Sequence, residues 1–278
     1  MNNRKIIQAL VFFFLSLLLS IFLANLVIPK ASSKLTAEDS TKVEQPSLYY
    51  LAVGDSLTEG VGDTTGQGGF ATLLANSFTN EFGYQVTYRN FGISGNTSSQ
   101  IFKRMKEDSD LAEALKDADV MTLTVGGNDL RKVILKNFTN LDVSTFDKPA
   151  TEYGKRLEKI VRLAREKNPN LPIYVIGIYN PFYLNFPELT DMQLVVDKWN
   201  QETESRTQKF SGVYFVPIND LLYKGLEGEQ GVSVNTSKIA NNLLYGEDSF
   251  HPNNTGYEII KQAVMEKIRA TKQEWKNK

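Results

Sequence analysis

Short apolar runs alternate with stretches of helical spacing over most of this chain of 278 residues. A turn signal follows each apolar run, which is typical of a strand, and the intervals have the apolar period of amphipathic helices. Strands that are buried on both faces and alternate with helices indicate a parallel sheet covered on each side. The sequence therefore predicts an α/β fold with three layers and a five-stranded parallel sheet. The predicted strands are Leu48–Val53, Gln85–Asn90, Val120–Val125, Ile173–Ile178 and Val213–Ile218. The predicted helices are Phe70–Phe82, Ser98–Lys116, Glu152–Lys167, Met192–Phe210 and a final helix over about Gly256–Trp275.

The first 30 residues differ in composition from the rest of the chain. Arg4 and Lys5 precede an almost unbroken apolar run over Ile6–Ile28. A bilayer span takes about 20 apolar residues, whereas the apolar part of a cleaved signal peptide has about 7–15. The run matches the longer figure, so residues 1–29 are predicted to be a signal anchor, a transmembrane helix with its positive end in the cytoplasm. A cleaved signal peptide is the alternative, and in both cases the rest of the chain is expected outside the membrane.

Residues 30–47 are polar and have no apolar period, so they are predicted to form a linker before a single domain over residues 48–278. The 31 Lys and Arg residues are balanced by 32 Asp and Glu residues, which argues against a nucleic-acid partner. The chain has no cysteine and a single histidine, so neither a zinc site nor another metal or cofactor is expected. The oligomeric state is left open.

The single histidine, His251, is the one side chain suited to act as a base near neutral pH. Asp248 precedes it by three residues and could hold the imidazole in the correct tautomer. Pro252 disfavours helix at His251, so both side chains are expected on one turn before the last helix. A serine hydroxyl needs such a base to become a nucleophile, and Ser56 follows the first predicted strand directly.

Two further segments follow predicted strands, at the sheet edge where parallel α/β proteins bind ligands. Gly92, after the second strand, could offer its N–H to an oxyanion, and Asn128, after the third, could offer its side-chain amide. Each segment taken alone could equally be a turn. Together with Ser56, they supply the donors that a tetrahedral intermediate of acyl transfer requires.

Four short segments carry the candidate site residues, in this order along the chain: Gly54-Asp55-Ser56-Leu57, Gly92 within Asn90–Gly95, Gly127-Asn128-Asp129, and Asp248-Ser249-Phe250-His251. They resemble the four sequence blocks of the GDSL/SGNH hydrolases and occur in the order of that family. The resemblance covers the domain from Leu48 to the end, and its closest form is the bacterial membrane-tethered lipase/acylhydrolase-like branch. It implies a flavodoxin-like fold, ester hydrolysis, a Ser56–His251–Asp248 triad, and an oxyanion hole formed by Ser56, Gly92 and Asn128.

The expected function is therefore that of a serine esterase or lipase-type acylhydrolase at the outer face of the cell membrane. Its substrate is expected to be a small-molecule, lipid or glycan ester. Tyr179, Asn180 and Phe182 follow the fourth strand and are possible substrate-binding residues, although ordinary loop packing would explain them as well. A carbohydrate or cell-wall O-acetyl esterase is the alternative function, and a non-catalytic binding module on the same fold is a more remote one.

Overall fold

The computed structural model describes residues 3–27, 45–137, 142–184, 186, 189–226, 232–233 and 239–275. The chain divides into two compact units, Met1–Glu44 and Gln45–Lys278. Most of the predicted linker lies outside the described residues, which resume at residue 45.

The first unit contains one helix in its described residues, α1 (Asn3–Val27). Apolar side chains of α1 are exposed, among them Phe12 and Leu18, which are 75% and 62% exposed. Across the described parts of the chain, no helix combines the length and the hydropathy that crossing a membrane requires. The transmembrane helix expected from the sequence is therefore not shown, and the membrane anchor remains a prediction.

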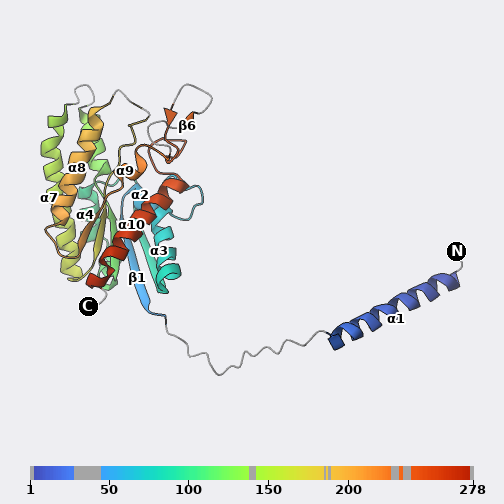
Figure 1. Ribbon diagram of the computed structural model, residues 1–278. Coiled ribbons are helices and arrows are strands. Elements are labelled where there is room, and N and C mark those ends of the chain that lie inside the picture. The colour runs from blue at the N-terminus through green and yellow to red at the C-terminus, as the bar shows by residue number, and fades with distance from the viewer. Residues whose placement is uncertain are drawn as a thin grey trace. The chain divides into compact units, whose positions relative to one another are not determined.

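The second unit is built on a sheet of five parallel strands in the order β2-β1-β3-β4-β5 (Figure 1). This sheet confirms the α/β fold that the sequence predicts. β1, β3 and β4 lie in the interior of the sheet and are mostly buried, whereas the edge strand β2 is partly exposed. β4 ends at Ile176 and β5 at Val216, earlier than predicted. The strands are β1 (Ser47–Gly54), β2 (Gln85–Gly92), β3 (Val120–Thr124), β4 (Ile173–Ile176) and β5 (Val213–Val216).

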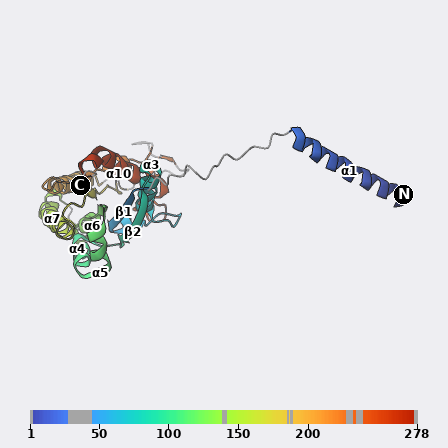
Figure 2. The same cartoon turned by 90° about the horizontal axis from the view of Figure 1, so that it is seen from below.

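Helices cover both faces of the sheet, which gives the three predicted layers (Figure 2). Alternate residues of β1 enter different cores because side chains of a strand point to opposite faces in turn. Leu51 and Val53 pack in the core that α4, α5, α7 and α8 cover, whereas Tyr50 and Ala52 pack in the core that α3 and α10 cover. These helices are α3 (Gly69–Phe82), α4 (Ser98–Glu107), α5 (Ser109–Asp117), α7 (Asp147–Lys167), α8 (Asp191–Thr207) and α10 (Asn254–Trp275).

The segment predicted as one helix over Ser98–Lys116 contains two helices, α4 and α5. Asp108 separates them in an extended conformation, and its side chain accepts hydrogen bonds from the N–H groups of Asp110 and Leu111. An aspartate that caps the next helix in this way ends the preceding one. The single apolar stripe of the segment did not indicate this break.

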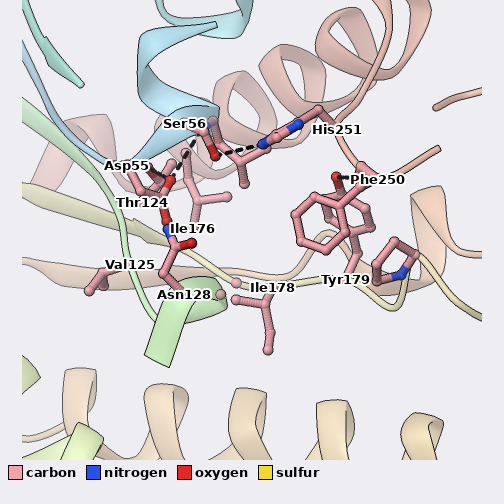
Figure 3. A pocket seen from close by; sticks show the side chains of 14 residues that line it. Asp55, Ser56, Thr124, Val125, Asn128, Ile176, Ile178, Tyr179, Phe250 and His251 are labelled. Carbon is pink, nitrogen blue, oxygen red and sulfur yellow. Dashed lines mark hydrogen bonds between the residues drawn. The ribbon is translucent and has the colours of Figure 1, made fainter. Parts of the chain in front are cut away.

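Short elements follow the carboxyl ends of the strands and carry most of the site. α2 begins one residue after the end of β1, and α6 begins soon after β3. The loop after β4 and the loop before α10 reach the same edge of the sheet (Figure 3). The short elements are α2 (Ser56–Glu59), α6 (Gly127–Lys136), the 3-10 helix η1 (Val143–Phe146), α9 (Asn219–Leu222), and the antiparallel pair β6 (Val232–Ser233) and β7 (Ile239–Ala240).

Candidate active site

Ser56 is the first residue of α2 and is only 6% exposed. Asp55 caps this short helix, because its Oδ1 accepts a hydrogen bond from the Leu57 N–H over 3.1 Å. Thr124, at the end of β3, donates its hydroxyl to Asp55 Oδ1 over 2.7 Å and accepts from the Asp55 N–H over 3.1 Å. Gly54 permits this approach, since a Cβ there would lie 2.2 Å from Thr124 Oγ1. The turn that presents Ser56 is therefore fixed by the neighbouring strand.

His251 and Asp248 meet Ser56 from the loop that precedes α10. Figure 3 shows the contact between His251 and Ser56. The His251 Nε2 lies 2.9 Å from Ser56 Oγ, and its Nδ1 lies 2.6 Å from Asp248 Oδ2. The other oxygen of Asp248 accepts from the N–H groups of Phe250 and His251 over 2.9 and 3.0 Å. The structure thus brings together the three predicted catalytic residues in a hydrogen-bonded chain.

The two carboxyl groups close to Ser56 have opposite pKa shifts. Burial raises the pKa of Asp55 above the ordinary aspartate value, although the hydroxyl of Thr124 opposes this shift. Burial also acts to raise the pKa of Asp248, but hydrogen bonds from the His251 ring and from backbone N–H groups outweigh it and lower that pKa. Asp248 is therefore the carboxyl whose charged form the protein favours, as a partner of an imidazole requires.

Several contacts hold the loop that carries His251. The Tyr179 hydroxyl donates to the Phe250 carbonyl over 2.5 Å, and the Tyr245 N–H donates to the His251 carbonyl over 2.7 Å. Ser249 adopts a φ of 52°, in the left-handed backbone region that residues other than glycine rarely occupy. The loop is therefore fixed by bonds on both sides of the imidazole.

Asn128 is the second residue of α6 and lines the same cavity as Ser56. Its Nδ2 donates to the Asn96 carbonyl over 3.1 Å, which orients the amide and leaves its second N–H for another acceptor. The following residue, Asp129, is 7% exposed and accepts from the N–H and the hydroxyl of Ser98 over 2.7 and 2.6 Å. Arg156 of α7 pairs with the same carboxylate at 3.1 Å, so the start of α6 is anchored to two other helices.

The N–H of Gly92, a predicted oxyanion donor, already has a partner. It donates to the side-chain oxygen of Asn90 over 2.8 Å. A Cβ at Gly92 would lie 2.1 Å from the Glu59 nitrogen, so this glycine is required for the packing of β2 against α2. The geometry therefore gives Gly92 a packing role in place of the predicted oxyanion contact.

Gly95 lies three residues further along the same segment, and its backbone N–H differs from those of its neighbours in its hydrogen bonding. In this turn the Ile93 N–H donates to Gly54, the Ser94 N–H to Glu59, and the Asn96 N–H to Ile93. Within the described residues, the Gly95 N–H makes no hydrogen bond, and Gly95 has a φ of 78°. The carbonyl of the next residue, Asn96, accepts a hydrogen bond from the Asn128 side-chain amide. Gly95 therefore lies beside the predicted donor Asn128. Sequence reasoning missed it, although Asn90–Gly95 contains two glycines.

A cavity with about 470 Å³ of empty space, part of it open to solvent, lies between these residues. Figure 3 shows Ser56 and His251 on one side of it, Ile178 on the opposite side, and Phe250 with Tyr179 at one end. Its lining comes from the carboxyl ends of three strands and from the loop of His251. The lining residues are Asp55, Ser56, Leu57, Thr124, Val125, Gly127, Asn128, Ile176, Gly177, Ile178, Tyr179, Pro181, Phe250 and His251.

Of the three residues predicted to bind substrate, only Tyr179 lines this cavity. Asn180 is 1% exposed and folds its own loop, since its Oδ1 accepts from the Phe182 N–H and its N–H donates to the Asn219 side chain. The Phe182 ring packs against the Phe250 ring with centroids 6.3 Å apart, which places it behind the wall of the cavity.

The described residues contain no group of three or more histidine, cysteine, aspartate or glutamate side chains that could hold a metal ion. The chemistry available at the cavity is instead that of a hydroxyl, an imidazole and a carboxylate in sequence. Such a chain can remove the serine proton during attack on a carbonyl carbon.

Comparison with known proteins identifies the family. The model of the GDSL-like lipase/acylhydrolase family matches residues 52–259. The uncharacterized protein YpmR of Bacillus subtilis is 34% identical over 223 residues, which cover 80% of this chain and 82% of that protein. Among solved structures, the lipase Lip_vut3 from a goat rumen metagenome aligns with a TM-score of 0.66 at 23% identity, over 79% of this chain and 96% of that one. An acetylxylan esterase of Geobacillus stearothermophilus, Axe2, aligns with a TM-score of 0.56 at 19% identity, over 81% and 95%.

The family model spans most of the domain and includes Ser56, Asn128, Asp248 and His251. Both solved structures share the fold of this domain. This chain therefore belongs to the GDSL-like lipase/acylhydrolase family and is an ester-bond hydrolase.

Proposed function

We propose that this protein is a serine esterase that cleaves carboxylic esters through an acyl-enzyme intermediate, with Ser56 as nucleophile, His251 as base and Asp248 as its partner. One observation carries the proposal: His251 contacts Ser56 Oγ at 2.9 Å through Nε2 and Asp248 at 2.6 Å through Nδ1. Both nitrogens of the only histidine are thus used in the order that the reaction requires.

In the acylation step, Ser56 Oγ forms a bond to the ester carbonyl carbon while its proton passes to His251 Nε2. The imidazolium that results is stabilised by the Asp248 carboxylate, whose lowered pKa favours the charged form. When the tetrahedral intermediate collapses, the bond to the alkoxy oxygen breaks and His251 returns the proton to the leaving alcohol. In deacylation a water molecule replaces the alcohol, and the acid leaves as Ser56 regains its proton.

The negative charge of the tetrahedral intermediate requires donors that point toward the carbonyl oxygen. The Ser56 N–H, the second Nδ2 hydrogen of Asn128 and the Gly95 N–H are the proposed donors. Gly95 replaces Gly92 in this set because the Gly92 N–H is already bonded to Asn90. Gly92 could donate to the oxyanion only if the Asn90 side chain rotated away from its N–H.

The decisive test is hydrolysis of p-nitrophenyl esters by the full chain and by its Ser56→Ala variant. The proposal predicts a loss of at least about a thousandfold in kcat/KM for Ser56→Ala. Ser94→Ala, an exposed serine on the neighbouring turn, is the matched control and should retain activity. Equal rates from Ser56→Ala and wild type would refute Ser56 as nucleophile. Loss of activity in Ser56→Ala also distinguishes an enzyme from a non-catalytic binding module on this fold.

A carbohydrate or cell-wall O-acetyl esterase is the second candidate function, and one observation favours it. The solved structure of an acetylxylan esterase shares this fold over 95% of its own length. The same catalytic residues would serve, and only the acyl group would differ. Release of acetate from acetylated xylan or peptidoglycan, measured against hydrolysis of longer acyl esters, separates the two functions.

We further propose that the domain works at the outer face of the cell membrane, anchored by residues 1–29. The apolar run Ile6–Ile28 behind Arg4 and Lys5 supports this location. In cells that produce the full chain, the enzyme should remain with the membrane fraction and be digested by protease added from outside. Recovery of an intact chain in the cytoplasmic fraction would contradict the proposal, and a shortened chain in the medium would indicate a cleaved signal peptide.

A further inference from the structure

The loop that joins α2 to α3, residues 60–68, contacts both the nucleophile and the segment of the base. Its first two residues are bonded to Ser56, whose carbonyl accepts from the N–H groups of Gly60 and Val61, each over 3.0 Å. Further along, the same loop packs against the chain at His251, which lies 195 positions from Ser56 in the sequence. The α2–α3 loop therefore connects the two partners of the proposed proton transfer through local contacts.

Gly62 lies directly against the backbone that carries the base. A Cβ at Gly62 would lie 2.4 Å from the Pro252 carbonyl oxygen and 3.3 Å from His251 Cβ. The φ of Gly62 is 94°, in the left-handed region that glycine adopts without strain. The backbone of the loop thus fills the space beside His251 Cβ, so a displacement of the loop would change the positions that the imidazole can take.

Hydrogen bonds join the same loop to the start of α10. The Thr64 N–H donates to Asn254 Oδ1 over 2.9 Å, and Asn254 Nδ2 donates to Thr64 Oγ1 over 2.8 Å. The Val61 carbonyl accepts from the hydroxyl of Tyr257, a buried residue, over 2.6 Å. These bonds hold the chain on the side of His251 that leads into α10.

The carboxylate of Asp63 holds the loop in this conformation by accepting five hydrogen bonds. The donors are the N–H and the hydroxyl of Thr65 at 2.8 and 2.6 Å, and the N–H groups of Gln67, Gly68 and Gly69 at 3.2, 3.0 and 3.0 Å. A charged carboxylate only accepts, so both of its oxygens suit such a set of donors. Burial acts to raise the pKa of Asp63, but these hydrogen bonds outweigh it and lower that pKa. The loop therefore favours the charged form of Asp63.

Asp63 also caps α3, because two of its donors are the N–H groups of Gly68 and Gly69 at the start of that helix. A cap alone would affect the stability of the fold and not the transfer of a proton. Asp142 is a matched case, since it caps η1 and accepts from both the N–H and the hydroxyl of Ser144. A comparison of Asp63 with Asp142 therefore separates capping from an effect on the base.

We propose that Asp63 is a positioning residue of the esterase, which holds the α2–α3 loop and thereby sets the distance and orientation of His251 relative to Ser56. This inference rests on the proposed serine esterase function, because the role of Asp63 is to align the nucleophile with its base. Asp63 acts through the loop and touches no reacting atom.

Kinetics of the purified full chain on p-nitrophenyl acetate give the first test. Asp63→Ala should lower kcat by at least about tenfold, because a small displacement of the base weakens its contact with Ser56 Oγ. KM should change less than about twofold, since the loop lies on the side of the base away from the ester. Asp142→Ala, the matched control, should keep the kcat of wild type.

Asn254→Ala is a milder variant, because it removes only the two bonds to Thr64 at an exposed position. We expect it to fold and to lower kcat about twofold to fivefold with KM retained. If Asp63→Ala does not fold, the measurements on Asn254→Ala decide the question.

The single histidine gives a readout that a loss of stability alone would not change. In the full chain labelled with ¹⁵N-histidine and purified without a histidine tag, the ring nitrogen signals in NMR spectra come from His251 only. Their chemical shifts report which ring nitrogen carries the proton and how each is hydrogen-bonded. The signals should shift or broaden in Asp63→Ala and in Asn254→Ala, and should equal those of wild type in Asp142→Ala.

Three results would overturn the positioning role of Asp63. The first is a kcat equal to that of wild type in both variants. The second is a fall in kcat with unaltered His251 ring signals, because Asp63 would then act by another route. The third is an equal effect of Asp63→Ala and Asp142→Ala on kcat and on the signals, which would indicate capping alone.

Labelling of wild type by a fluorophosphonate distinguishes failure of this inference from failure of the proposed function. A wild type that is labelled at Ser56 and active, but whose kcat and ring signals do not respond to Asp63→Ala, keeps the serine mechanism and loses the positioning role. A wild type that is neither labelled nor active on esters would overturn both proposals.

Discussion

The hydroxyl of Tyr179 donates a 2.5 Å hydrogen bond to the carbonyl of Phe250, the residue immediately before His251. Tyr179 lies just beyond the end of β4, so this bond ties the loop of the base to the sheet. Tyr179 is 8% exposed, and its ring lines the cavity. The contact thus connects the apolar wall of the cavity with the position of the imidazole.

Tyr179→Phe removes this bond and keeps the apolar ring. We expect kcat to fall about fivefold to tenfold, because one lost hydrogen bond at a buried carbonyl costs about 1 kcal/mol or slightly more. KM for a short ester should change less than about twofold, since the wall of the cavity is retained. Steady-state kinetics of Tyr179→Phe and of the control Tyr183→Phe measure this difference. A fall confined to KM would contradict the positioning role of the Tyr179 hydroxyl.

Asp248→Asn should leave the loop in place and lower kcat by about a thousandfold or more, because the imidazole loses the partner that sets its tautomer. Steady-state kinetics measure the change in kcat.

Asp248→Asn should also change the pH dependence of the free energy of unfolding. The folded-state pKa of Asp248 is lowered, so its stabilising effect is present above the unfolded pKa of about 4 and is lost as pH falls through the folded value. The difference between wild type and Asp248→Asn in the free energy of unfolding should therefore shrink between neutral pH and about pH 3. Urea unfolding at both pH values measures it, and a difference that grows on acidification would contradict the direction of the shift.

Asn128→Ala should reduce kcat by about a hundredfold to a thousandfold with little change in KM, as expected for a donor used mainly in the transition state. The control is Asn137→Ala at the other end of α6, where the side chain donates only to the Val133 carbonyl. An equal effect of the two variants on kcat would indicate that Asn128 acts through helix stability alone.

Gly92→Ala tests the role that the structure gives to this glycine. An added Cβ would lie 2.1 Å from the Glu59 nitrogen, and backbone atoms cannot move away easily. We expect the free energy of unfolding to fall by about 3 kcal/mol, against less than about 0.5 kcal/mol for Gly246→Ala. Thermal and urea unfolding of both variants provide the comparison. Unchanged stability together with a loss of kcat would restore Gly92 as an oxyanion donor.

The sheet and its layers could be predicted from the sequence because apolar runs of strand length alternate with helical periods. The contact of Ser56 with His251 across 195 positions was expected because a serine nucleophile needs a base and because both residues lie in segments that resemble the family blocks. The proline after His251 also indicated correctly that the base lies on a turn before the last helix.

The structure departs from the expected arrangement in features that residue type and spacing do not determine. Whether a glycine N–H is free to donate depends on the backbone dihedrals of the turn. The Gly92 N–H donates to Asn90, whereas that of Gly95 has no partner in the described structure. Asn180 follows a strand as expected, but its amide is used within its own loop. Asp108 divides a helix because its side chain caps the next one, which a single apolar stripe does not reveal.

The most direct test of the Ser56–His251 pair is mass spectrometry of the protein after brief exposure to a fluorophosphonate. We expect a single adduct in wild type, on the peptide that contains Ser56, no adduct in Ser56→Ala, and a labelling rate at least about a hundredfold lower in His251→Ala. An adduct on another residue, or equal labelling rates with and without His251, would contradict the proposed mechanism.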